Sequence, residues 1–369
     1  MIQKKMKSTD NINIGEMKMR IIVQNPYYIF EDQQRNFNGY NYKFIEKYCD
    51  GIFLYARPWK YFQYKNKLKE LGWDKKIYLT LRTANRKSDI LICFNGRPYL
   101  KKNHPSARYK KIKIFHVMDF SEKTNSVNGA MVQGNVDYLM GYCQHDKYSG
   151  FFRKYFTTYI GKVIGVPFGY GGRFEYRNPF ESRINKCVAL GSVNPVKDPL
   201  IQEGNLQEYE SYYSGHIYSH ELRKAIVDYC NEWKEYIDSM LPVYPETKNN
   251  SYDAVEELNK YTMFINDASI DKFPPARTYE GIACGAVMVA EDLSVFKEIG
   301  FIDNVNCILF EKGNYQEMIA KISYYMSNYE KLKQLQEHSL ELSEKFTHKK
   351  VAEQLFENIK KVFNERSMF

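Results

Sequence analysis

The chain has 369 residues, a formal net charge of +9 and a hydrophobic content of 44%. This length accommodates two domains with buried cores, and no apolar run reaches the length of a membrane span. The seven cysteines are scattered without a C-x-x-C pair, which indicates a reduced, cytosolic protein without a zinc site. The modest positive charge fits an anionic small ligand, an anionic membrane surface, nucleic acid or simply a soluble surface.

Residues 1–17 contain no apolar block and are predicted to be a disordered lead-in rather than a secretory signal. From residue 18 onward, short β-branched runs alternate with segments that suit helices. The runs expected to form strands are residues 19–25, 51–57, 76–80, 88–96 and 111–119. This alternation predicts an α/β domain with a largely parallel sheet over residues 18–166.

A second series of the same kind follows a glycine-rich "GYGG" segment, and residues 167–182 are predicted to form a hinge. Its strands are expected within 183–197, 253–267, 285–292 and 306–311, and 219–233 is expected to be an amphipathic helix. The second domain is predicted to span residues 183–348. Two such domains would face each other across a cleft, where ligands bind at the carboxyl ends of parallel strands.

The segment "FPPARTYEGIACGAVMVAEDL" (273–293) predicts a short helix that leads into a buried strand. The amino end of such a helix suits a phosphate, and Arg277 adds a charged fork beside it. Glu280, one turn further on, suits the two hydroxyls of a ribose. The alternative is a solvated Glu280 with Arg277 as its ion-pair partner. Thr278 and Tyr279, which lie between them, are also candidate donor contacts.

The acid followed by small residues, "ACG" and an apolar strand resembles the nucleotide-sugar-binding segment of group 1 GT-B glycosyltransferases. The segments "KVIGVPFGYGGRF" and "CVALGSVNPVKDP" agree with the same family in order and spacing. The resemblance covers residues 160–350, and residues 18–160 by layout alone. It implies two Rossmann-like domains facing a cleft, with the final helix, residues 349–369, crossing back to the first domain. The pattern R-x-x-E-x-x-A-C-G resembles a subgroup of spore-maturation and surface-polysaccharide transferases.

The resemblance also assigns roles by position. Glu280 matches the acid that binds the ribose, and Lys197 matches a lysine that contacts the pyrophosphate. Ser192 stands where the family has an arginine, so Arg277 is a candidate replacement for that charge. The retaining branch has a glutamate eight residues before the ribose-binding acid, and here that position is Lys272. Asp271 is one residue out of register, and both residues are candidate contacts to the donor sugar or acceptor.

The first domain is expected to bind the acceptor. His116 and Asp119 follow a predicted strand and are candidate catalytic residues, with either one as the general base. A structural histidine and a turn aspartate are the alternative. Asn95 and Arg97, at the end of another strand, are candidate acceptor or phosphate contacts.

The resemblance therefore predicts a transfer of sugar from a nucleotide-diphosphate donor to a glycan or lipid-linked acceptor. No D-x-D motif occurs in the sequence, so we expect no metal and no other cofactor. An anionic membrane surface is a further candidate partner for a cytoplasmic enzyme, whereas nucleic acid is not expected. The alternatives are a nucleotide-sugar 2-epimerase with the same layout and a catalytically silent nucleotide- or glycan-binding module.

Overall fold

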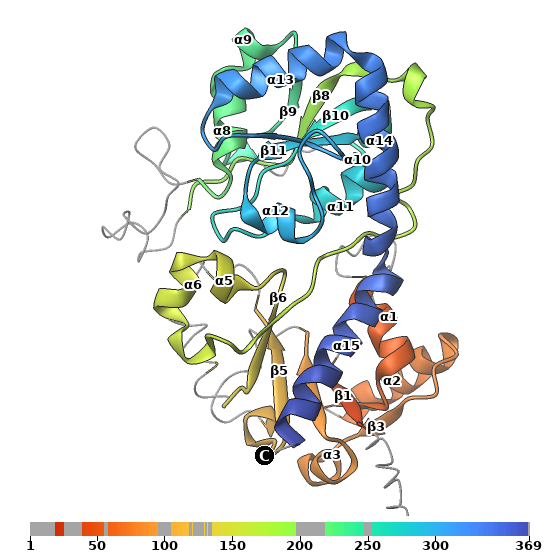
Figure 1. Cartoon of the computed structure of the whole chain (residues 1–369). Coiled ribbons are helices and arrows are strands. Elements are labelled where there is room, and N and C mark those ends of the chain that lie inside the picture. Colours follow the sequence, from red (N-terminus) through yellow and green to blue (C-terminus); the bar gives the residue numbers. More distant parts are fainter. Residues whose placement is uncertain are drawn as a thin grey trace, which may run out of the picture.

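The computed structural model describes residues 19–25, 39–54, 58–94, 105–117, 120, 129, 131, 135–196, 218–246 and 252–367. These residues form two α/β domains, one above the other in Figure 1, each built on its own parallel sheet. The α/β class and the two-domain architecture expected from the sequence are confirmed. In this part of the chain no helix is both long and apolar enough to cross a membrane.

The first sheet has seven parallel strands in the order β3-β2-β1-β4-β5-β6-β7. Its strands are β1 (Ile21–Gln24), β2 (Gly51–Phe53), β3 (Lys76–Tyr78), β4 (Ile90–Cys93), β5 (Ile112–His116), β6 (Tyr138–Gly141) and β7 (Val163–Gly165). Strands β1, β4 and β5 are buried along their whole length, as both faces of a parallel sheet require. The helices of this domain are α1 (Tyr40–Tyr48), α2 (Pro58–Glu70), α3 (Leu81–Lys87), α5 (His145–Tyr148) and α6 (Gly150–Tyr155).

The second sheet has five parallel strands in the order β12-β11-β10-β8-β9. They are β8 (Ile184–Leu190), β9 (Ile237–Met240), β10 (Tyr261–Ile265), β11 (Val287–Glu291) and β12 (Ile308–Phe310). Successive residues of β8 and β10 point into two different apolar clusters, so helices cover both faces of this sheet. These helices are α8 (Glu221–Asp228), α9 (Cys230–Trp233), α10 (Ala254–Lys260), α11 (Ala276–Ala283), α12 (Ser294–Glu298), α13 (Tyr315–Ser327) and α14 (Tyr329–Ser343).

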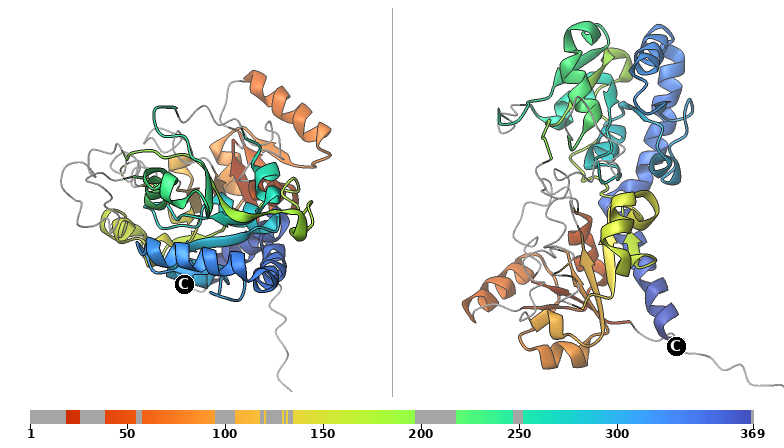
Figure 2. Two further views of the ribbon diagram at one scale, coloured as in Figure 1. Left: turned by 90° about the horizontal axis from the view of Figure 1, so that it is seen from above. Right: turned by 90° about the vertical axis from the view of Figure 1, so that its left-hand side faces the viewer.

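The last helix, α15 (His348–Ser367), returns to the first domain and lies beside α1, as Figures 1 and 2 show. Val351, Leu355 and Ile359 are fully buried there in the same apolar cluster as strands β1 and β4. The crossing helix implied by the resemblance is therefore present. Burying its apolar stripe ties the end of the chain to the first domain.

The two segments that cross between the domains are hydrogen-bonded to each other. Tyr170 N donates to Phe346 O at 2.9 Å, and His348 N donates to Tyr170 O at 3.0 Å. Gly169 has a φ of +68°, and a Cβ at this position would lie 2.6 Å from Phe346 O. The close approach of the two segments therefore requires glycine at residue 169.

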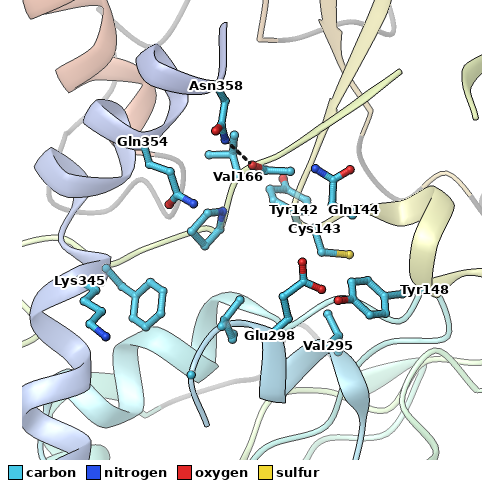
Figure 3. Close-up of a pocket in the computed structure, with 15 residues that line it drawn as sticks. Tyr142, Cys143, Gln144, Tyr148, Val166, Val295, Glu298, Lys345, Gln354 and Asn358 are labelled. Atoms are coloured by element: carbon cyan, nitrogen blue, oxygen red, sulfur yellow. Dashed lines mark hydrogen bonds between the residues drawn. The ribbon is translucent and has the colours of Figure 1, made fainter. Parts of the chain in front are cut away.

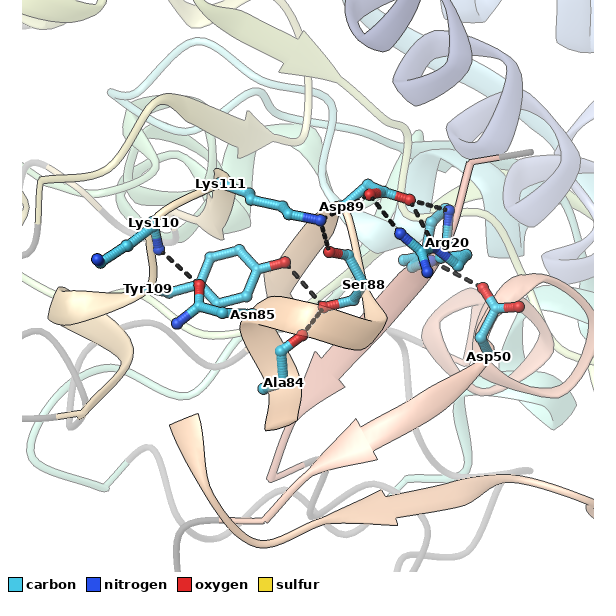
Figure 4. A network of polar contacts seen from close by, with 10 residues as sticks. Arg20, Asp50, Ala84, Asn85, Ser88, Asp89, Tyr109, Lys110 and Lys111 are labelled. Carbon is cyan, nitrogen blue, oxygen red and sulfur yellow. Dashed lines mark hydrogen bonds and ion pairs between the residues drawn. The ribbon is translucent and has the colours of Figure 1, made fainter. Parts of the chain in front are cut away.

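A polar network holds the amino ends of the first sheet together, at the edge opposite the expected ligand site (Figure 4). Asp89 accepts hydrogen bonds from Arg20 Nε at 3.0 Å and from Lys111 Nζ at 2.8 Å. Burial raises the pKa of Asp89, but the bonds from Arg20 and Lys111 outweigh this effect and lower it to about 2. Asp50 adds an acceptor for the backbone N–H of Ile21 at 2.8 Å.

Candidate active site

Helix α11 positions Arg277 and Glu280 as the sequence predicts. Pro275 precedes the helix in an extended conformation, and Glu280 follows one turn into it. Arg277 Nε lies 3.5 Å from Glu280 Oε2, so the predicted ion pair forms. Glu280 is only 8% exposed, however, and burial raises its pKa while Arg277 and Arg173 oppose that shift. The ion pair of the alternative interpretation is therefore present, although Glu280 is not solvated, and its contact with a ribose stays a prediction.

A second guanidinium, which the sequence analysis missed, lies at the end of β8. Helix α8 places Arg223 over Gly191, where a Cβ would lie 2.5 Å from Arg223 Nη1. The same nitrogen is 3.5 Å from the backbone oxygen of Ser192. Arg223 thus brings a positive charge to the position where Ser192 stands in place of the family's arginine. No local pattern marks Arg223, because the contact depends on how α8 packs against β8.

Arg223 and Arg277 belong to one cationic site. Burial lowers the pKa of Arg223, Asp267 opposes this shift, and the positive charge of Arg277 adds to it, so the two guanidinium groups lie within electrostatic reach of each other. Arg277 Nη1 is buried and has no hydrogen-bond partner among the described residues. A buried N–H donor of this kind is costly unless a ligand accepts its hydrogen bond. The site therefore suits an anion.

The carboxyl group of Asp267 follows β10 and is 4% exposed. Its Oδ2 accepts a hydrogen bond from the backbone N–H of Arg223 at 3.2 Å and lies 3.8 Å from His220 Nδ1. Burial raises the pKa of Asp267 to about 8 and lowers that of His220 well below its usual value. Burial thus favours the uncharged form of both groups, so Asp267 offsets less of the charge of Arg223 than an exposed carboxylate would.

Thr278 and Tyr279 lie inside the second domain. Both side chains are fully buried, and Thr278 Oγ1 accepts a hydrogen bond from Asn266 Nδ2 at 2.9 Å. Tyr279 packs against the ring of Phe346 with a centroid distance of 4.9 Å. These contacts give both residues a structural role. A contact from either residue to a nucleotide-sugar donor stays a prediction.

Asp271 and Lys272 lie on the loop between β10 and α11. Asp271 is 4% exposed, and Lys272 has a φ of +55°. The backbone oxygen of Lys272 faces Cys143 Sγ of the first domain at 3.7 Å. This loop therefore borders the first domain, as a donor-sugar or acceptor contact requires, and the role of either side chain stays a prediction.

His116 ends β5 and is 2% exposed, with its ring against Tyr142 at a centroid distance of 4.8 Å. Burial lowers its pKa to about 4, against a smaller opposite effect of the Phe94 backbone. A second histidine, His145, is fully buried nearby and has a pKa of about 3 for the same reason. Both rings are neutral at pH 7, and such low basicity makes His116 a weak general base in this conformation. In the sequence, the segment "YCQHD" after β6 is the pattern that could have identified His145 as a candidate.

The remaining predicted residues cannot be placed. Asn95, Arg97, Asp119 and Lys197 lie outside the described residues. Their predicted roles are neither supported nor contradicted by the structure.

A pocket of about 510 Å³ lies between the two domains and is shown in Figure 3. Tyr142, Cys143 and Tyr148 line it from the first domain, and Glu298 faces them from α12. An ion pair of 2.7 Å between Lys147 Nζ and Glu298 Oε2 joins the domains beside it. Arg223, Arg277 and Glu280 do not line this pocket, so it is separate from the cationic site.

Comparisons with known proteins agree with this geometry. Residues 208–357 match the family model described as glycosyl transferase-like. The structure of Anabaena HepE in complex with UDP-glucose matches with a TM-score of 0.54 at 12% identity, covering 93% of this chain and 100% of that one. The chain has the GT-B fold.

Two further solved structures support this fold. A glycosyltransferase from Rickettsia africae has a TM-score of 0.52 at 13% identity, covering 94% of this chain and 99% of that one. Sucrose-phosphate synthase from Thermosynechococcus elongatus has a TM-score of 0.52 at 11% identity, covering 94% and 100%. A search of curated protein sequences finds no match.

Proposed function

We propose that the enzyme transfers a sugar from a uridine diphosphate donor to a hydroxyl of a glycan or lipid-linked acceptor, without a metal ion. The observation that carries the proposal is the convergence of Arg223 and Arg277 at the carboxyl ends of the second sheet, with a buried donor of Arg277 left unpaired. A diphosphate supplies the acceptors that this site lacks. The complex of Anabaena HepE with UDP-glucose supports a nucleotide sugar of this kind.

Each group has a defined task in this proposal. Arg223, Arg277 and the amino end of α11 hold the diphosphate and stabilise the charge that develops on it as the sugar leaves. Glu280 accepts hydrogen bonds from the ribose hydroxyls. The first domain presents the acceptor hydroxyl, and closure of the domains excludes water from the reacting sugar.

Arg223→Gln tests the proposal directly. Losing one charge-assisted contact should weaken UDP binding by about ten- to a hundredfold in calorimetry. The control is Lys234→Gln, an exposed lysine of the same domain whose loss should leave the affinity unchanged. An unchanged affinity for UDP in Arg223→Gln would overturn the assignment of the donor site.

Turnover separates this function from its alternatives. A transferase releases UDP in proportion to glycosylated acceptor, and it should keep its rate in excess EDTA. A nucleotide-sugar 2-epimerase alters the sugar without an acceptor, and a silent binding module gives neither product.

The cellular setting belongs to the proposal as well. We infer a role in surface polysaccharide or glycoconjugate synthesis at the cytoplasmic membrane face, in line with the subgroup resemblance and the net charge of +9. Pelleting with vesicles that contain anionic lipid, but not with neutral vesicles, is the expected result. Equal pelleting with both would remove the membrane from the proposal.

A further inference from the structure

A second pocket, of about 550 Å³, lies at the hinge where the two crossing segments meet α1. Its volume falls within the range of small-molecule sites. The described residues that line it include four cationic side chains and one acid, which are Lys43, Arg173, Arg177, Lys349 and Glu175. We call it the hinge pocket.

The acid does not neutralise the hinge pocket. Glu175 Oε1 lies 3.2 Å from Arg177 Nε and is therefore engaged by one arginine. Among the described residues, Lys43 pairs only with Glu46, at an exposed site on the same helix. Lys349 has no carboxylate partner in the described part of the chain. The pocket thus keeps an excess of positive charge.

Arg173 supplies a hydrogen-bond donor whose surroundings indicate an anionic ligand. Its Nε is buried and makes no hydrogen bond to any described residue, although its guanidinium lies 4.7 Å from the centre of the Phe174 ring. A charged N–H group that is withdrawn from water and left without an acceptor costs free energy, which an anion in the pocket would recover.

Two helices add to this charge. Gly39, the residue before α1, and Thr347, His348 and Lys349 at the start of α15 all line the hinge pocket. The amino end of a helix carries a partial positive charge and favours anions. Here two such ends, which are far apart in the sequence, meet at one pocket together with the four cationic side chains.

From these observations we propose that the hinge pocket binds a phosphate or carboxylate group. The anion is carried by an acidic acceptor or is a free phosphate. The hinge pocket is separate from the cationic site, since Arg223, Arg277 and Glu280 do not line it. Arg173 lies within electrostatic reach of both sites, because its charge opposes the rise that burial causes in the pKa of Glu280. The possibility of an acidic acceptor rests on the proposed function, whereas the anion site itself does not.

Calorimetry with inorganic phosphate, glucose 6-phosphate and uncharged glucose tests this inference, each measured with UDP at saturation so that the donor site is filled. Both phosphates should bind and glucose should not. Tighter binding of glucose 6-phosphate than of phosphate identifies an acidic acceptor as the source, and equal affinities identify a free anion.

Two pairs of variants assign the binding to the hinge pocket. Lys43→Gln with Lys349→Gln should weaken phosphate binding by about tenfold. The control combines Lys47→Gln with Lys350→Gln, which lie on the same two helices but outside the pocket. It should leave phosphate binding unchanged. Gly172 lines the pocket, and a side chain there would meet open space. Gly172→Asp should place a carboxylate in the pocket and weaken phosphate binding by repulsion. Gly172→Asn has a similar shape without the charge and should not weaken it.

Phosphate binding that UDP abolishes, or that persists unchanged in both Gly172→Asp and the Lys43/Lys349 variant, would overturn the inference. The affinity for UDP alone, measured in the same variants, reports on the proposed function separately. If the protein binds UDP but no phosphate, the hinge-pocket inference fails and the proposed function stands. If it binds phosphate but no UDP, the assignment of the donor site fails and the hinge-pocket inference stands.

Discussion

Glu280 is the residue on which the donor assignment most directly depends. Its carboxylate is held beside Arg277 in a site that is almost closed to water. Glu280→Gln keeps the shape of the side chain but removes the charge that favours two ribose hydroxyls. We expect UDP affinity to fall by about tenfold in calorimetry, with no loss of thermal stability. Glu341→Gln, on the exposed face of α14, is the control. Wild-type affinity in Glu280→Gln would exclude the ribose contact.

Asp267 should make both stability and donor binding sensitive to pH. Its pKa of about 8 in the folded chain lies above the ordinary value of 3.8, so the native state keeps a proton that the unfolded chain releases. Stability should therefore fall as the pH rises from about 4 to about 8. Above that range the ionised carboxylate sits beside Arg223 and should weaken UDP binding.

Asp267→Asn should remove both effects, because an amide does not titrate. The measurements are urea unfolding and UDP calorimetry across this pH range, with Asp228→Asn on the surface of α8 as the control. Parallel pH profiles for wild type and Asp267→Asn would show that Asp267 is ionised throughout.

At the scale of the elements, the contact between the two crossing segments depends on Gly169. Alanine there would need a positive φ and would place its Cβ 2.6 Å from Phe346 O. We expect Gly169→Ala to destabilise the protein by about 1–3 kcal/mol in urea unfolding. Gly172→Ala is the matched control, since a Cβ at residue 172 meets nothing within 4 Å. Equal stability of the two variants would contradict this account of the crossing.

The ends of strands β8 and β10 show why elements matter more than motifs here. Each strand is followed by a polar residue, Ser192 after β8 and Asp267 after β10, and neither residue alone makes a diphosphate site. The site arises because α8 lays Arg223 across the end of β8 while α11 brings Arg277 to the end of β10. A parallel sheet gathers such loops at one edge, which is the physical reason for a ligand site there.

For the molecule as a whole, α15 belongs to the first domain although it follows the second in sequence. Leu355 is fully buried in the core that α15 shares with α1. Leu355→Ala should destabilise the first domain by about 2–5 kcal/mol and leave the second domain little changed.

Fluorescence can separate the two domains in that experiment. Trp73 packs in the first-domain core and Trp233 in the second, so variants that retain one tryptophan each report one domain. Lys361→Ala, on the exposed face of α15, should have no effect on either signal. An equal shift of both signals in Leu355→Ala would mean that the domains unfold as one unit.

The sequence by itself determined the α/β class, the two sheets and the pairing of Arg277 with Glu280. These features depend on local periodicity and on residues one helical turn apart, which a linear pattern records. The crossing helix was expected only from the family resemblance. The tertiary structure decided the rest. Arg223 reaches Ser192, His145 lies near His116, and the starts of helices α1 and α15 meet in one pocket only because distant elements pack together. The shifted pKa values of Asp267 and His116 follow from the same packing, since burial is a property of the folded chain and not of a motif.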